Sequence, residues 1–167
     1  MNTTHKILES HGLVRFQDCD PFNHLNNAAY LNYLVNARED QLLANYGINI
    51  YDVHSLSGKS WVVSSNQIAY IRPARLMEKI VMQSQLIGYT QSETHVELRM
   101  YNEDKTQLKA VMWGCYVHID LKAQKRTTHD QTLMDLFQQV HYPVEADIFE
   151  QRVAQLRQEF SDKSVSQ

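Results

Sequence analysis

The order of the periodic segments limits most strongly what this chain can fold into. One helical pattern covers residues 27–46, and Gly47 is placed to end it in a left-handed conformation. A short strand is predicted at 12–17, and four strand-like runs follow the helix: 60–72, 76–89, 92–103 and 106–121. This order predicts an α+β fold in which an antiparallel five-stranded sheet wraps around one long central helix.

Side-chain periodicity predicts which faces are buried. In the helix, Tyr30, Leu34 and Ala37 share one face, which we expect to pack on the core. The run 92–103 alternates apolar and polar residues, as in a strand with one buried and one solvated face. An amphipathic helical stretch at about 131–161 comes last, and it could cover a sheet face or build an oligomer contact.

The chain has 167 residues, which suits one core domain with an addition. We predict a core domain at 1–125 and a C-terminal helical extension at 126–167, with residues 161–167 disordered. The net charge of −3 and a pI near 6.2 give no reason to expect nucleic acid as a partner. No apolar run is long enough to cross a bilayer, so no membrane association is expected.

Cysteine usage and the N-terminus point to the cytoplasm. Cys19 and Cys115 form neither a metal-binding spacing nor a disulfide framework. Residues 1–9 lack the basic-then-apolar order of an export signal, so we expect the native chain to start here. His118 and His129 have no acidic or thiol partner at ligand spacing. We therefore predict no metal and no cofactor.

The loop before the helix carries the candidate chemistry. Asp20 and His24 lie between the first strand and a helix start that Asn26 or Asn27 can cap. A helix N-terminus supplies unpaired N–H groups and a partial positive charge, which polarise a carbonyl. A carboxylate supplies a nucleophile or a general base. Together these groups suit attack on an acyl carbon.

The motif over residues 15–30 reads R-F-x-D-x-D-x-x-x-H-x-N-N-x-x-Y. It resembles the opening motif of the hotdog-fold thioesterases, in particular the 4-hydroxybenzoyl-CoA thioesterase group and related acyl-CoA thioester hydrolases. Its D-x-x-x-H-x-N-N part is also similar to the plant acyl-carrier-protein thioesterases. The resemblance is densest over residues 14–34 and continues loosely to about 121. It implies a hotdog fold and hydrolysis of acyl-CoA to a free carboxylic acid and coenzyme A.

The resemblance assigns roles to individual residues. Asp20 matches the catalytic carboxylate, as nucleophile or general base. The main-chain N–H groups of Asn27 and Ala28 match the site that holds the thioester oxygen. His24 either orients water or is hydrogen-bonded scaffolding. The chain departs from the family motif at two positions: Phe22 replaces an asparagine of the plant pattern, and Asn27 stands where many bacterial relatives carry histidine. Both differences leave Asp20 with fewer assisting side chains.

Substrate-binding residues are expected beside this loop. Four side chains are candidates for lining an acyl tunnel: Tyr30, Tyr33, Leu34 and Trp61. Core packing explains Tyr30 and Tyr33 better than a binding role does, and it explains Trp61 equally well. Arg72 and Arg75 lead the candidates for binding the phosphates of coenzyme A, because guanidinium groups suit phosphate geometry. Further basic residues at turns are Lys79, Lys122, Lys125 and Arg126.

Three alternatives to an acyl-CoA hydrolase follow from the same motif. An acyl-acyl carrier protein thioesterase would need a basic docking surface, and a non-catalytic acyl-binding protein would not need Asp20. A hotdog dehydratase ranks low because Glu39 and Asp40 fall too late on the helix to face His24. In all cases the open sheet edge predicts a homodimer or homotetramer with the site near the subunit interface.

Overall fold

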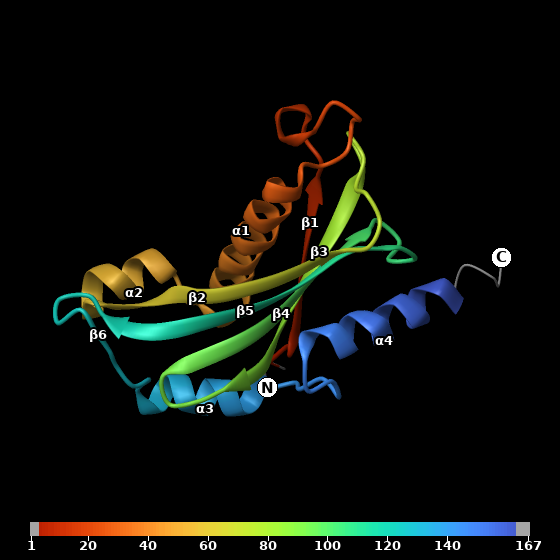
Figure 1. Cartoon of the computed structure of the whole chain (residues 1–167). Helices are drawn as coiled ribbons and strands as arrows, with labels where there is room; N and C mark the ends of the chain where they lie inside the picture. Colours follow the sequence, from red (N-terminus) through yellow and green to blue (C-terminus); the bar gives the residue numbers. More distant parts are fainter. Residues whose placement is uncertain (1–3, 163–167) are drawn as a thin grey trace.

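A computed structural model describes residues 4–162. Its main element is a curled antiparallel sheet with the strand order β1-β3-β4-β5-β2 (Figure 1). The long strands are β1 (Ile7–Leu13), β2 (Lys59–Tyr70), β3 (Lys79–Tyr89), β4 (Glu93–Asn102) and β5 (Leu108–Asp120), and the short β6 (Lys125–Arg126) pairs with β5. The helices are α1 (Asn27–Tyr46), α2 (Ile50–Ser57), α3 (Gln131–Val140) and α4 (Phe149–Asp162). The predicted α+β architecture is confirmed.

Helix α1 begins and ends where its sequence signals place it. The side chain of Asn26 caps its N-terminus, and Gly47 ends it with a φ of 66°. Glycine adopts this left-handed conformation without the steric cost that other residues meet. The predicted core face is confirmed, since Tyr30, Leu34 and Ala37 are all buried.

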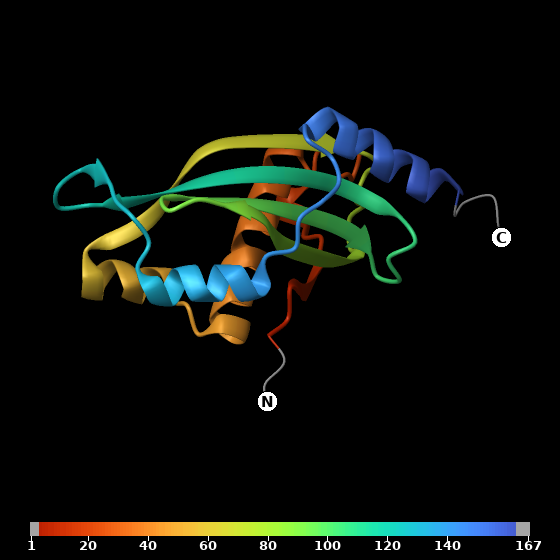
Figure 2. The same ribbon diagram turned by 90° about the horizontal axis from the view of Figure 1, so that it is seen from below.

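The concave side of the sheet holds the main core. Helices α1, α2 and α3 lie on this side, and α4 lies on the opposite side (Figure 2). Buried apolar side chains of α1 and α3 pack here against inward-facing residues of β3, β4 and β5, among them Leu34, Phe137, Ile80, Leu98 and Met112. Burying such side chains is the main favourable term that holds α1 inside the sheet.

The outer face of β4 is buried, which corrects the expectation of a solvated face. Helix α4 packs on the outer side of the sheet through Phe149, Leu156 and Phe160. Beneath it, Glu97 is fully buried at 0% exposure, and Arg152 of α4 donates two hydrogen bonds of 2.8 Å to its carboxylate. Of the two roles open to the C-terminal helices, α4 therefore covers the sheet.

Three further differences concern segment boundaries. The first strand is Ile7–Leu13 and not 12–17, and residues 16–18 form a turn of 3-10 helix. The helix α2 was not predicted. Of the segment expected to be disordered, Ser161 and Asp162 end α4, and residues 163–167 lie outside the described part. Among the described helices, none is long and apolar enough to cross a membrane.

Candidate active site

Asp20 sits in a tight loop that its own carboxylate organises. Its Oδ1 accepts hydrogen bonds from the backbone N–H groups of Phe22, at 2.9 Å, and His24, at 3.1 Å. Asn23 turns the chain with a φ of 58°, a conformation that asparagine tolerates better than most residues. Among the described residues, no donor reaches Oδ2. One carboxylate oxygen therefore holds the loop, and the other is available to a substrate.

Two tyrosines of α1 bond to the Asp20 loop and to the connection between β2 and β3 beside it. The Tyr33 hydroxyl donates to Asp18 Oδ2 at 2.6 Å, and the Tyr30 hydroxyl accepts from the backbone N–H of Ala74 at 2.9 Å. Burial and the hydrogen bond to Asp18 raise the pKa of Tyr33, so the phenol stays neutral and donates. Asp18 thus joins the loop to α1, and Tyr33 faces the loop scaffold.

The start of α1 offers one unpaired backbone donor. Asn26 Oδ1 accepts from the N–H of Ala28 at 3.0 Å, and the Asn26 carbonyl accepts from Ala29 at 2.8 Å. Within residues 4–162, the N–H of Asn27 has no acceptor. Of the two N–H groups expected to hold the thioester oxygen, that of Ala28 serves the cap and that of Asn27 is free to polarise a carbonyl.

Tyr70, at the end of β2, is a residue that the sequence analysis missed. Its hydroxyl donates to the Asn27 carbonyl at 2.9 Å, and its ring meets the Tyr30 ring edge-on at 5.2 Å. No local pattern singled it out, because its neighbours on β2 alternate as any strand does. Tyr70 positions the first residue of α1 against the sheet.

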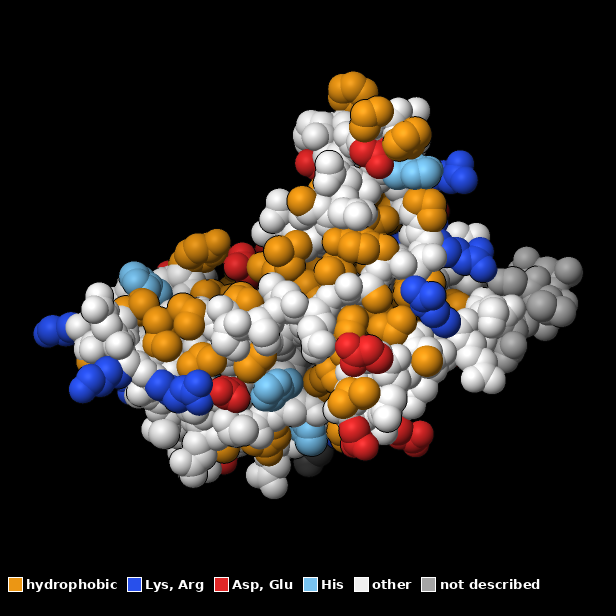
Figure 3. All heavy atoms as spheres, viewed as in Figure 1, with side chains coloured by type: hydrophobic (Ala, Val, Ile, Leu, Met, Phe, Trp, Pro, Cys, Tyr) orange, Lys and Arg blue, Asp and Glu red, His pale blue; other side chains and the backbone are white. Residues whose placement is uncertain are grey.

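These groups line an open cleft of about 320 Å³. The cleft brings together five sequence-predicted residues with Tyr70, namely Asp20, His24, Asn27, Tyr30 and Arg72. Figure 3 shows apolar, acidic and histidine side chains gathered at the tip of the molecule, above the start of α1. Arg75 does not line the cleft, and its backbone N–H donates to Glu78 Oε2 at 2.8 Å.

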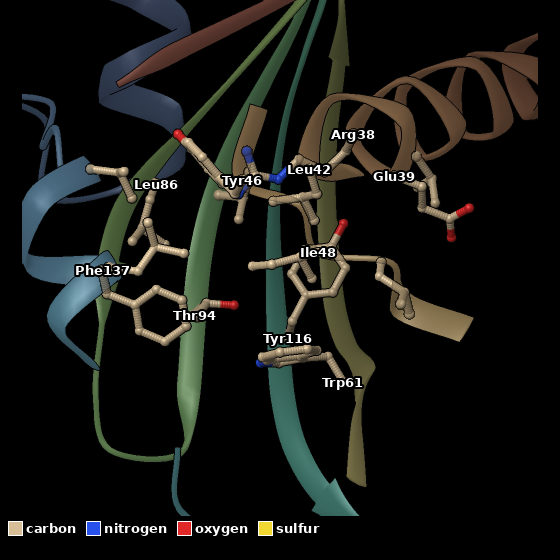
Figure 4. A pocket seen from close by; sticks show the side chains of 15 residues that line it. Arg38, Glu39, Leu42, Tyr46, Ile48, Trp61, Leu86, Thr94, Tyr116 and Phe137 are labelled. Carbon is tan, nitrogen blue, oxygen red and sulfur yellow. The ribbon is translucent and has the colours of Figure 1, made fainter. Parts of the chain in front are cut away.

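A second, more enclosed cavity of about 90 Å³ lies deeper between α1, α3 and the sheet (Figure 4). Its wall is mostly apolar and shares no residue with the cleft around Asp20. Of the four candidate tunnel residues, only Trp61 lines it. Tyr30 lines the cleft, and Leu34 is fully buried in the core.

Trp61 is held in the cavity wall by two histidines. Its indole N–H donates to His129 Nε2 at 3.0 Å, and the His129 ring stacks on His118 with centroids 4.6 Å apart. Burial lowers the pKa of both histidines, and His118 lowers that of His129 further. His129 therefore stays neutral and accepts from Trp61.

The described residues contain one group with ligand atoms close enough for a metal ion. Glu93, His95 and Cys115 place these atoms within 4.8 Å of one another, and Glu93 already pairs with Arg126 at 2.7 Å. This group lies on the outer side of the sheet, away from Asp20. The absence of a metal from the chemistry stays a prediction.

Comparison with known proteins places the chain in a family. The profile of the thioesterase-like superfamily matches residues 14–159. The chain belongs to this superfamily. The long-chain acyl-CoA thioesterase FadM of Escherichia coli K12 is 30% identical over 127 residues, which cover 76% of this chain and 94% of FadM. The superfamily member described here is accordingly a thioesterase.

Solved structures agree with this assignment. The probable thioesterase YbaW of Escherichia coli matches with a TM-score of 0.69 at 27% identity, over 81% of this chain and 99% of YbaW. The Staphylococcus aureus protein SAV2348, solved in complex with CoA, matches in fold with a TM-score of 0.75 at 12% identity, over 86% of this chain and 90% of its own. The predicted hotdog fold is confirmed.

Proposed function

We propose that this thioesterase hydrolyses acyl-CoA to a free carboxylic acid and coenzyme A. One observation carries the proposal: Asp20, whose Oδ2 is free, and Asn27, whose N–H is unpaired, line the same cleft. The N–H stabilises the oxygen that becomes negative as the thioester carbon is attacked. Its position at a helix N-terminus adds a favourable partial charge.

Two routes fit these groups. Asp20 Oδ2 attacks the acyl carbon and forms a mixed anhydride, which water then hydrolyses, or it takes a proton from a water that attacks directly. In both routes the thiolate of coenzyme A leaves and is protonated. Among the described residues, the His24 ring has no hydrogen-bond partner, so it can orient the attacking water. Arg72 lines the cleft and Arg75 follows three residues later in the chain, and we assign both to the phosphates of coenzyme A.

We further propose that two copies pair through β2. Residues 62–67 of this edge strand are exposed, and an open edge favours pairing with another chain. An antiparallel two-fold pairing centred on this window sets Tyr70 of one copy opposite Lys59 of the partner subunit. The cleft around Asp20 then lies close to Trp61 of the partner subunit, and the acyl group passes from the cleft into the partner's cavity. The oligomer would be a dimer or a tetramer of such dimers.

Thiol release from a panel of acyl-CoA substrates tests the proposal. We expect turnover of acyl-CoA that exceeds turnover of the same acyl group on acyl carrier protein. The reverse order would indicate an acyl-acyl carrier protein thioesterase. Binding without release at any chain length would indicate a non-catalytic acyl-binding protein. A cytoplasmic location stays a prediction, which localisation of the tagged native chain would test.

A further inference from the structure

Arg38 places a positive charge in the wall of an otherwise apolar cavity. It lines the cavity between α1 and the sheet together with Val35, Leu42 and Val96. Figure 4 shows its side chain reaching from α1 toward the strands, between Leu42 and Tyr46. A helical arginine with this surrounding is unusual, because isolated charges in apolar environments are costly.

The Arg38 guanidinium lacks an acidic partner within the described residues. Its one hydrogen bond there is from Nη1 to Ser84 Oγ, at 2.9 Å, and no carboxylate lies at ion-pair distance. Burial lowers the pKa of Arg38, although arginine remains charged in proteins. A guanidinium carries five N–H donors, so most of its capacity is unused by the neighbouring side chains. An anion in the cavity would supply the missing partner.

Tyr116 adds a second unused donor to the same cavity. Its buried hydroxyl has no hydrogen-bond partner within residues 4–162, and Figure 4 shows it pointing toward α1. Burial raises the pKa of Tyr116, so the phenol keeps its proton and can donate it. Glu39 also lines the cavity, but its carboxylate accepts from the Tyr51 hydroxyl at 3.4 Å and turns away from Arg38 in Figure 4.

We propose that the cavity binds the far end of an acyl group that carries a terminal carboxylate, held by Arg38 and Tyr116. The proposal rests on the proposed function, in which the acyl group of the substrate enters this cavity. The apolar wall accepts the methylene chain, and the guanidinium and phenol accept the carboxylate at its end. The preferred substrates are then mono-CoA thioesters of dicarboxylic acids.

The test compares pairs of substrates of equal chain length. One member is a straight-chain acyl-CoA with a terminal methyl group, and the other is the mono-CoA thioester of the dicarboxylic acid. The measured quantity is the ratio of kcat/KM for the carboxyl-ended over the methyl-ended substrate. We expect Arg38→Gln to lower this ratio by roughly 10- to 100-fold, the effect of losing a charge-assisted hydrogen bond. Tyr116→Phe should lower it by about 5-fold.

Ser84→Ala is the matched control. It removes the bond that ties Arg38 to β3 and keeps the charge in the cavity, so it should lower the melting temperature and preserve the ratio. Equal losses on both substrates in Arg38→Gln would mean that Arg38 only braces α1 against the sheet, and this result would overturn the proposal. Hydrolysis of methyl-ended substrates with no turnover of carboxyl-ended ones by the wild type would also overturn it.

A binding measurement tests the carboxylate site even if the protein does not hydrolyse acyl-CoA. If the wild type hydrolyses no thioester, titration calorimetry with a free dicarboxylic acid tests the cavity directly. Binding to the wild type that weakens at least 10-fold in Arg38→Gln would support the carboxylate site. Equal binding to the two proteins, or no binding to the wild type, would refute it.

Discussion

Asp20→Asn separates the two roles of the Asp20 carboxylate. Asparagine keeps an Oδ1 acceptor for the backbone N–H groups of Phe22 and His24, so the loop should hold its shape. It replaces Oδ2 by an amide nitrogen, which can neither attack a thioester nor take a proton from water. The variant therefore changes the reacting atom and leaves the scaffold in place.

The expected size of the effect follows from this division. Removing a general base lowers turnover by about 10²- to 10⁴-fold, or roughly 3 to 5 kcal/mol of transition-state stabilisation. The free energy of unfolding should change by less than about 1 kcal/mol, because both loop hydrogen bonds survive. Asp20→Ala loses the Oδ1 acceptor of both loop hydrogen bonds and should be about 1 kcal/mol less stable than Asp20→Asn.

The assay combines three measurements on each variant: thiol release, calorimetric binding of acyl-CoA, and the urea midpoint. Asp18→Asn is the matched control, because Asp18 lies two residues away and accepts from the Tyr33 hydroxyl outside the cleft. It should lose stability and keep most of its turnover. An Asp20→Asn protein that keeps more than about a tenth of wild-type turnover would refute the role of Asp20 in the chemistry.

Three further outcomes are expected. Trp61→Ala enlarges the cavity and should raise the acyl chain length at which activity falls, because each buried methylene adds roughly 0.8 kcal/mol to binding. An unchanged cutoff in the acyl-CoA panel would contradict this. Val63→Glu on the exposed edge of β2 should sediment as a monomer and have low activity, whereas Ile7→Glu on the β1 edge should not. If both variants are dimers of normal activity, the pairing through β2 is contradicted. Buried His118 and His129 have lowered pKa values, so the unfolded state takes up protons first as the pH falls below about 6.5. The urea midpoint should therefore decrease as the pH is lowered from about 7 to 5, and the decrease should be smaller in His118→Phe. Equal pH profiles of the wild type and the variant would argue against this role of the stacked histidines.

Local signals explain what the sequence could predict. Helix α1 was predicted from the capping position of Asn26, from Gly47 and from the spacing of its apolar residues, all of which act within a few turns. Helix α2 carries similar signals that were overlooked, since Asn49 caps it and Gly58 ends it with a φ of 69°. The first strand was placed too late because Leu8 is the only buried residue in Ile7–Leu13.

Within the candidate site, too, the residues predicted from the sequence are those with local signals. Asp20 and His24 belong to a contiguous motif, so the sequence alone predicted them as candidates. Tyr70 was missed because its role depends on a hydrogen bond to Asn27, which is 43 residues away in the chain. Arg38 resembles an ordinary exposed helical charge in sequence, and only the fold reveals that it faces a cavity.

Glu97 shows why the outer face of the sheet could not be predicted. Its charge and its alternation with apolar neighbours indicate a solvated face, yet its partner Arg152 comes 55 residues later, on α4. The hydrogen bonds and the charge of Glu97 raise the pKa of Arg152, and Trp113 donates to the same carboxylate at 2.8 Å. Arg99 also lies at ion-pair distance, with its Nε 3.4 Å from Glu97 Oε1. Removing Glu97 would leave both arginines without this buried carboxylate, which is strongly destabilising. These contacts commit α4 to the outer face of the sheet, and the exposed edge of β2 is the surface through which we propose that two copies join their sheets.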